Sequence, residues 1–176
     1  WLRWPLGLLA LLAAGLAMVQ ARGMGINFLL SVLLLVWMAD IAAYFAGRAL
    51  GQRFIKVKLA PSISPGKSWE GALGGAVGVM LMAVLWVQCD AQRQPDSLSL
   101  FSHLAQGGWA LLVLATLFLT AMSVLGDLVE SLIKRSAGVK DSSQLLPGHG
   151  GVLDRIDALV PTLPLAMMLV SSVTVI

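Results

Sequence analysis

Apolar residues fill five long windows of the chain, and polar residues collect in the segments between them. The windows cover about residues 4–20, 26–46, 71–88, 109–129 and 154–175. Because a helix that crosses a bilayer needs roughly 20 mostly apolar residues, each window predicts a membrane-spanning helix. The first and third windows are short, which indicates tilted helices or helices that extend past the window. The pattern predicts an all-α, polytopic integral membrane bundle of about five transmembrane helices.

The composition excludes a soluble protein. Of the 176 residues, 58% are hydrophobic and 12% are charged, whereas a soluble domain averages about 25% charged residues. We expect residues 1–176 to form a single transmembrane catalytic domain. Because the chain begins with Trp1 rather than methionine, we expect it to be the C-terminal part of a longer chain. The loops at about residues 47–70 and 130–153 are expected to face the cytoplasm.

The charged residues predict both the orientation and the position of a site. If the amino terminus is cytoplasmic, ten of the twelve Lys and Arg residues lie on the cytoplasmic side, and only Arg22 and Arg93 lie outside. The positive-inside rule favours this orientation. Seven of the nine acidic residues fall on the same side, at helix ends or in the cytoplasmic loops: Asp40, Glu70, Asp127, Glu130, Asp141, Asp154 and Asp157. A solvated surface would scatter these charges, so their convergence predicts a functional site.

Asp40 lies about two turns inside the second apolar window. Tyr44 and Gly47 follow it at helical spacing and share its face. A bare carboxylate is too costly to bury, so Asp40 must be paired, protonated or bound to a metal. A pair with Arg48 that only fixes helix packing is the alternative, but ionisable residues inside membrane spans favour a functional role.

The segment before the third window has the composition of a phosphate-binding turn. Ser64, Lys67 and Ser68 offer hydroxyl groups and an ammonium group at a helix start, where free backbone N–H groups also attract anions. The spacing is not that of a Walker A loop. Ser68 is equally suited to cap the helix, with Glu70 stabilising its first turn. Both roles are compatible.

Glycines recur through the third window at positions 71, 74, 75 and 78. Small residues four positions apart let membrane helices approach closely. We therefore favour a packing role over contact with a ligand, and the same face would permit a homodimer.

Two acidic pairs flank the last polar segment. Asp127 and Glu130 end the fourth window, and Asp154 and Asp157 begin the fifth, each pair three residues apart. Carboxylates at this spacing share a helix face, and Mg²⁺ binds carboxylate oxygens together with substrate phosphates. The two pairs predict one cation site or two. Compensation of the helix dipole partly explains the second pair, but not the first.

The segment between these pairs carries cations and a glycine-rich turn. The turn includes His149, Gly150 and Gly151, and its glycines permit a close approach of the backbone to a ligand. The charged residues of the segment are Lys134, Arg135, Lys140, Asp141 and Arg155. Cations beside metal-binding carboxylates indicate phosphate chemistry at a membrane surface.

The run from Ser131 to Asp157 resembles the signature of the phosphatidate cytidylyltransferase family, also called CDP-diacylglycerol synthases. That pattern is serine, two residues, Lys-Arg, four residues, Lys-Asp, then a Pro-x-His-Gly-Gly turn that closes on Asp-Arg-x-Asp, and every position is present. Segments 39–48 and 59–71 also resemble family blocks, so the likeness covers about residues 37–157. The one departure is Ser68, where threonine is expected, and it keeps the hydroxyl group.

The resemblance implies transfer of the cytidylyl group of CTP to phosphatidic acid, with Mg²⁺ and possibly a second cation. It implies metal ligands at Asp127 and Asp154, with further acidic contributions from Glu130 and Asp157. The remaining residues expected to act in catalysis or to bind substrate are Lys134, Arg135, Lys140, Asp141, His149, Arg155, Asp40, Tyr44, Ser64, Lys67, Ser68, Glu70, Gly150 and Gly151. His149 is expected to position a phosphate or ribose. The expected location is a bacterial inner membrane, with the site facing the cytoplasm.

Three alternatives remain. A CDP-archaeol synthase or a CTP-dependent polyprenol kinase would share the scaffold and differ in the lipid acceptor or in the phosphorus attacked. A cation-coupled transporter would use Asp40 and Asp127 for ions, but transporters favour midplane sites between repeats, and no repeat is evident. Nucleic acid is not an expected partner.

Overall fold

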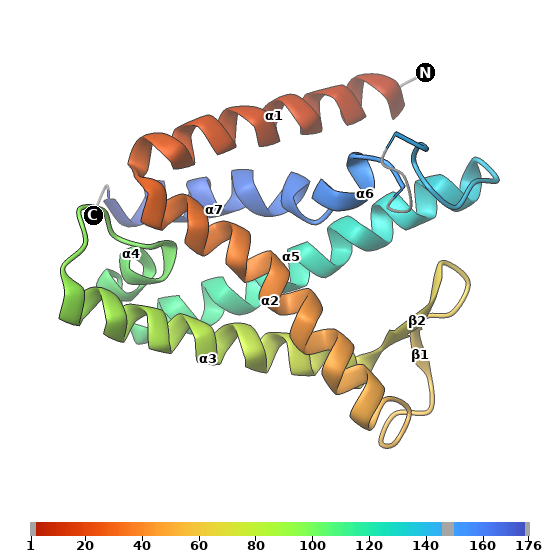
Figure 1. Ribbon diagram of the computed structural model, residues 1–176, viewed down its shortest axis with the longest axis horizontal. Coiled ribbons are helices and arrows are strands. Elements are labelled where there is room, and N and C mark those ends of the chain that lie inside the picture. Colours follow the sequence, from red (N-terminus) through yellow and green to blue (C-terminus); the bar gives the residue numbers. More distant parts are fainter. Residues whose placement is uncertain (1–2, 146–149, 175–176) are drawn as a thin grey trace.

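Five long apolar helices make up most of the structure. The computed structural model describes residues 3–145 and 150–174, and Figure 1 shows its elements. The long helices are α1 (Arg3–Met24), α2 (Ile26–Leu50), α3 (Trp69–Arg93), α5 (Trp109–Ser136) and α7 (Leu159–Thr174), the last preceded by the single turn α6 (Leu153–Ile156). Five helical segments in these ranges are long and apolar enough to cross a membrane. The prediction of an all-α, polytopic integral membrane protein is confirmed.

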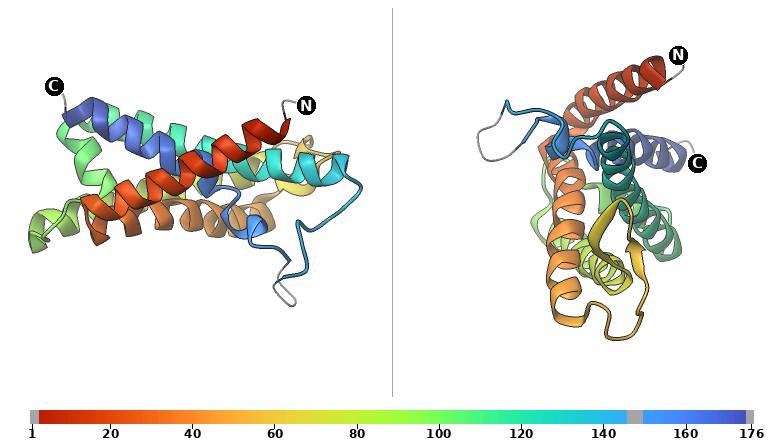
Figure 2. Two further views of the ribbon diagram at one scale, coloured as in Figure 1. Left: turned by 90° about the horizontal axis from the view of Figure 1, so that it is seen from above. Right: turned by 90° about the vertical axis from the view of Figure 1, so that its right-hand side faces the viewer.

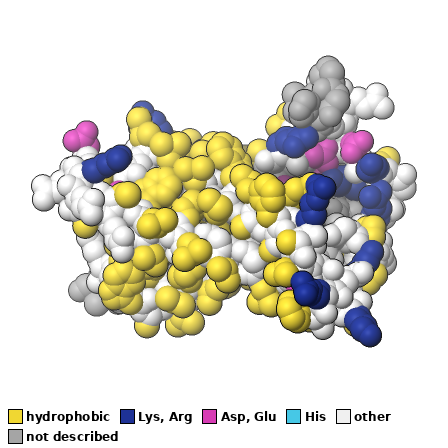
Figure 3. Space-filling model, turned by 60° about the horizontal axis from the view of Figure 1, so that its bottom comes forward, with side chains coloured by type: hydrophobic (Ala, Val, Ile, Leu, Met, Phe, Trp, Pro, Cys, Tyr) yellow, Lys and Arg dark blue, Asp and Glu magenta, His cyan; other side chains and the backbone are white. Residues whose placement is uncertain are grey.

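The elements have two distinct ends. The amino end of α1, the hairpin of β1 (Lys58–Ala60) and β2 (Ser64–Ser68), and the segment after α5 lie at one end, which we call the hairpin end (Figures 1 and 2). The short helix α4 (Leu100–Gln106) and the carboxyl end of α7 lie at the opposite α4 end. Figure 3 shows an apolar band between the ends, with most of the visible charge at the hairpin end. The two segments predicted to face the same side of the membrane therefore lie at the same end of the bundle (Figure 1).

Several element boundaries differ from the predicted ones. The predicted loop 47–70 contains the antiparallel hairpin, in which Lys58 lies opposite Ser68. The predicted loop 130–153 begins late, because α5 continues as a helix to Ser136. An ion pair between Glu130 and Lys134, one turn apart, supports this polar extension. The short hairpin carries too few residues for a periodic signal.

The segment between the third and fourth apolar windows contains α4, which folds back into the bundle. Leu100, Phe101 and Leu104 are completely buried. The α3 carboxylate Asp90 accepts hydrogen bonds from the amide of Asn27, the backbone N–H of Ser99 and the hydroxyl of Ser102, at 3.0, 3.0 and 2.6 Å. This network closes the α4 end.

His103 of α4 is part of the same packing. Its ring meets the ring of Phe28 edge-on at a centroid distance of 5.8 Å. Burial lowers the pKa of the His103 imidazole, although the nearby charge of Asp90 opposes the shift. His103 is therefore a neutral packing residue at neutral pH.

Glycines bring α2 and α3 into close contact. A Cβ added at Gly74 would lie 2.1 Å from the Cβ of Ala46, and one at Gly78 would lie 2.5 Å from the Cβ of Ala42. The packing role predicted for these glycines is confirmed, and it is satisfied within the chain. Because α2 covers this face, a homodimer would have to use another surface.

Candidate active site

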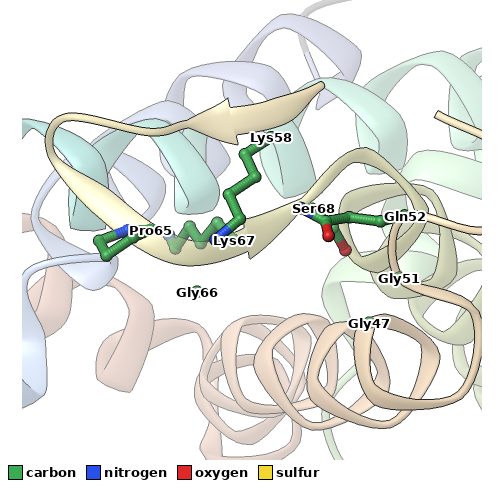
Figure 4. A pocket seen from close by; sticks show the side chains of 8 residues that line it. All are labelled: Gly47, Gly51, Gln52, Lys58, Pro65, Gly66, Lys67 and Ser68. Atoms are coloured by element: carbon green, nitrogen blue, oxygen red, sulfur yellow. The ribbon is translucent and has the colours of Figure 1, made fainter. Parts of the chain in front are cut away.

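Two adjoining cavities lie at the hairpin end, beside the carboxyl end of α2. The hairpin cavity, of about 210 Å³, lies between α2 and the hairpin (Figure 4) and is lined by Gly47, Gly51, Gln52, Lys58, Pro65, Gly66, Lys67 and Ser68. The α2 cavity, of about 370 Å³, is lined by Asp40, Ala43, Tyr44, Gly47, Arg48, Leu59, Gly66, Lys67, Ser68, Gly71, Ala72 and Val124. The two share Gly47, Gly66, Lys67 and Ser68. The two cavities therefore adjoin at these four residues, and we call the pair the hollow.

Local sequence explains this position. The backbone N–H of Gly51 donates to the carbonyl of Gly47 at 2.9 Å and ends α2. Ser68 begins α3 as its N-cap, because its hydroxyl accepts a hydrogen bond from the backbone N–H of Gly71 at 3.1 Å. A Cβ at Gly71 would lie only 3.0 Å from the carbonyl oxygen of Ala43. Glycine thus brings the start of α3 close to α2, with the hairpin beside them.

The structure separates the residues predicted to bind phosphate before α3. Lys67 and Ser68 line both cavities. Ser64 lies at the start of β2 opposite Ala60 and lines neither. Glu70 is buried, and its Oε1 accepts hydrogen bonds from the backbone N–H groups of Phe54 and Ile55 at 3.1 and 2.8 Å. Glu70 therefore holds the loop after α2 against the start of α3.

Lys67 connects the hairpin to an acidic cluster. Its Nζ lies 2.5 Å from Oδ2 of Asp127 on α5, while Oδ1 of Asp127 accepts a hydrogen bond from Ser131 at 3.3 Å. The charge of Asp127 acts on Asp40 of α2 and on Asp157, which follows α6. Acidic side chains from three parts of the chain thus lie within electrostatic range of one another, as the convergence in the sequence predicts.

A second ammonium group lies among the other predicted metal ligands. Lys134 forms an ion pair with Glu130 and lies 2.6 Å from Oδ1 of Asp154. Oδ2 of Asp154 accepts hydrogen bonds from the backbone N–H and hydroxyl of Ser142 and from the backbone N–H of Gly151, at 3.0, 2.8 and 2.6 Å. The carboxylates of Glu130 and Asp154 are largely buried. Asp154 therefore organises the segment after α5.

The two described glycines of the predicted turn are needed for this arrangement. Gly150 has a φ of +79°, and a Cβ there would lie 2.8 Å from Oδ2 of Asp154. A Cβ at Gly151 would lie 2.0 Å from the hydroxyl oxygen of Ser142. These glycines close the chain onto Asp154. His149, which was predicted to position a substrate, lies outside the described residues.

The other predicted residues lie around these cavities and networks. Tyr44 lines the α2 cavity, and its hydroxyl accepts a hydrogen bond from Arg48 at 3.0 Å. Four predicted site residues have exposed side chains at the hairpin end: Arg135, Lys140, Asp141 and Arg155. The sequence analysis did not predict Lys58 and Gln52 as residues that line a cavity. Lys58 lies in β1, and the sequence contains no signal for this short hairpin.

The donor set fits the cation predicted from the sequence. In the described ranges, no group of three or more His, Cys, Asp or Glu side chains is arranged to hold a metal ion. Mg²⁺, however, binds through one or two carboxylates together with substrate phosphates and water. Asp127 and Asp154 offer hard carboxylate oxygens, and each already holds a cation in the form of a lysine ammonium group.

The fold and site define a class of protein: an integral membrane protein with a cationic hollow and an acidic cluster at one end of its bundle. The sequence profile of the cytidylyltransferase family matches residues 4–173. The chain belongs to this family.

Curated relatives agree. The phosphatidate cytidylyltransferase of Haemophilus influenzae is 49% identical over 140 residues, which cover 80% of this chain and 44% of that protein. The enzyme of the same name from Pseudomonas aeruginosa is 44% identical over 166 residues, covering 93% of this chain and 55% of that protein. The one from Staphylococcus epidermidis is 41% identical over 150 residues, covering 85% and 51%. The chain spans about half the length of these relatives.

Proposed function

We propose that the full protein transfers the cytidylyl group of CTP to phosphatidic acid, giving CDP-diacylglycerol and pyrophosphate. The observation that carries the proposal is the junction of two cavities at Lys67, whose ammonium group pairs with Asp127. The names of the curated relatives support the same reaction. The site would face the cytoplasm of a bacterial cell from the inner membrane, where soluble CTP and a membrane lipid both have access.

The linings of the cavities suit the two substrates differently. The hairpin cavity carries Lys58 and Lys67, which suits the triphosphate of CTP. The α2 cavity adds the apolar side chains of Ala43, Leu59, Ala72 and Val124 and the guanidinium group of Arg48. Apolar walls with the two cations Arg48 and Lys67 suit a lipid phosphate beside its acyl chains. Lys67, which lines both, would lie between the reacting phosphates.

The reaction needs alignment and charge neutralisation more than proton transfer. An ionised oxygen of the lipid phosphate attacks the α-phosphorus of CTP, and a new P–O bond forms. The bond from the α-phosphorus to the bridging oxygen breaks, and pyrophosphate leaves with the electron pair. Because the attacking phosphate is already ionised near neutral pH, no general base is required. Lys67 would stabilise the charge that develops at the transferring phosphorus, and both cavities would hold the reactants in line.

Mg²⁺ is the cofactor that we propose for this site. Asp127 and Asp154 would hold it, with Glu130 and Asp157 as further acidic groups. When bound, the cation neutralises charge on the phosphates of CTP. Lys67 and Lys134, which now pair with Asp127 and Asp154, would then turn to the phosphates as those carboxylates take the cation.

The test is direct. Purified full-length protein is incubated with Mg²⁺, phosphatidic acid and CTP labelled at the α-phosphorus, and the lipid products are separated. Labelled CDP-lipid and release of pyrophosphate are expected. Release of CDP with a newly phosphorylated lipid would instead favour a lipid kinase, and absence of CDP-lipid from folded protein would contradict the proposal.

Lys67 provides the residue-level test. Lys67→Met should lower kcat by about a hundredfold, the effect typical of losing one donor to a developing charge, while Lys67→Arg should keep part of the activity. Arg93→Met is the matched control, because Arg93 is an exposed cation in the last turn of α3, at the opposite end of the bundle. Equal losses in the Lys67 and Arg93 variants would contradict the assignment.

A further inference from the structure

The loop between α2 and β1 presents apolar and basic side chains together on its outer surface. We call residues 51–57 the interfacial loop. Phe54 and Val57 are 74% and 67% exposed, and Ile55 is 38% exposed. The exposed cations Arg53 and Lys56 alternate with them. Exposed apolar side chains interleaved with cations are typical of segments that lie in a membrane interface.

Hydrogen bonds to neighbouring elements fix the backbone conformation of this loop. The buried carboxylate of Glu70 accepts hydrogen bonds from the backbone N–H groups of Phe54 and Ile55. The backbone N–H of Arg53 donates to the carbonyl of Leu50 at 3.0 Å. These hydrogen bonds fix the backbone so that the side chains of Phe54 and Val57 stay exposed. Apolar side chains are normally more stable in the core, where they are removed from water. An exposed apolar surface of this kind indicates a partner.

The position of the loop identifies the partner. It follows directly from the last residue of the spanning helix α2, and its backbone is tied to Glu70 in the first turn of α3. The first residue of α3 is Trp69, which is 45% exposed, and tryptophan favours the membrane–water interface. The loop therefore lies at the depth of the lipid headgroups. Its cations match anionic headgroups, while Phe54 and Val57 match the acyl boundary beneath them.

We infer that the interfacial loop docks onto anionic phospholipid headgroups of the surrounding bilayer and inserts Phe54 and Val57 among them. The first two residues of the loop, Gly51 and Gln52, line the hairpin cavity. Docking would therefore fix one wall of that cavity against an anionic lipid surface. This inference stands on the loop itself and does not depend on the proposed reaction.

A single fluorescent reporter tests the inference. The full-length protein, with its other cysteines replaced, receives an environment-sensitive label at Val57→Cys and is placed in nanodiscs of phosphatidylcholine alone or with phosphatidylglycerol. A lipid-borne quencher near the headgroups reports insertion. Two cations should make the ratio of docked to undocked loop about 30-fold larger on the anionic surface than on the neutral one. Arg53→Gln with Lys56→Gln should remove the difference.

Val139→Cys is the matched control position, because Val139 is also exposed and lies just after α5 at the hairpin end. Its label should be quenched less, and equally in both nanodiscs. Equal quenching of the two labels, or a Val57 label insensitive to phosphatidylglycerol, would overturn the inference. A third nanodisc carries phosphatidic acid in place of phosphatidylglycerol. An effect seen only there would also overturn the inference, because it would indicate a substrate site rather than a docking surface. No step uses CTP, so failure here is separable from failure of the proposed reaction.

Discussion

Substitution of Asp154 by asparagine separates a structural role from a metal-binding one. Sequence reasoning assigns Asp154 to a cation, whereas the structure shows its two oxygens accepting from Lys134, Ser142 and Gly151. Asp154→Asn keeps the shape of the side chain and removes its charge. If Asp154 organises the segment after α5, the variant should loosen that segment even when no divalent cation is present.

The size of the effect follows from burial and the number of donors. The side chains of Lys134 and Asp154 are 16% and 12% exposed, so their contact is close to a buried ion pair. Breaking such a pair costs about 3–5 kcal/mol. Asparagine keeps one acceptor oxygen, so we expect the lower value, about 3 kcal/mol of local stability. At about 1.4 kcal/mol for each factor of ten, amide hydrogens protected by this contact should exchange about a hundredfold faster.

Hydrogen exchange of the full-length protein in nanodiscs, with a chelator present, measures this change. The informative amides are those of Ser142 and Gly151, which donate directly to Asp154. Asp141→Asn is the control, because Asp141 is a neighbouring exposed carboxylate. Unchanged exchange in Asp154→Asn, together with loss of activity, would refute the structural role and leave Asp154 as a ligand alone.

Three further predictions concern other parts of the molecule. Gly74→Ala should cost about 1–3 kcal/mol by overpacking against α2 and lower the unfolding temperature, whereas Gly15→Ala, with nothing within 4 Å of the added Cβ, should not; equal effects would contradict the close packing. Asp90→Leu leaves the donors of the α4 network unpaired and should cost about 1–3 kcal/mol, measured by thermal unfolding against the exposed control Asp96→Leu; identical curves would contradict the network. Chelation of divalent cations should weaken CTP binding, measured by calorimetry, because the acidic cluster repels the nucleotide; unchanged affinity would contradict this argument.

The spanning helices and the convergence of the site were predictable because both follow from the bilayer. Its thickness sets the length of each apolar window, and the alternation of spans places every second loop at the same end. The close packing of Gly74 was predictable because a small residue in a membrane helix has a recognised packing role. These signals are local in sequence or imposed by topology.

The partners of individual charges were not predictable, because they depend on contacts between distant segments. Glu70 binds backbone N–H groups of the loop after α2, and such groups are present at every residue other than proline, so they leave no sequence signal. Lys134 meets Glu130 only because α5 continues past the apolar window that defined its predicted end. The hairpin that places Lys58 in a cavity is too short to show a period. The role of each charged side chain therefore depends on tertiary contacts.

The site at the hairpin end carries more carboxylates than ammonium groups around its two partly buried lysines, and this excess affects which ligands it can bind. Five carboxylates interact around Lys67 and Lys134, namely Asp40, Asp127, Glu130, Asp154 and Asp157. The five formal negative charges outnumber these two ammonium groups in a partly buried space, where repulsion is stronger than in water. The triphosphate of CTP, the substrate that we propose, would add to this excess, so the proposed reaction would favour a nucleotide that arrives with a cation. The same excess holds both ammonium groups at the carboxylates until phosphate oxygens compete for them.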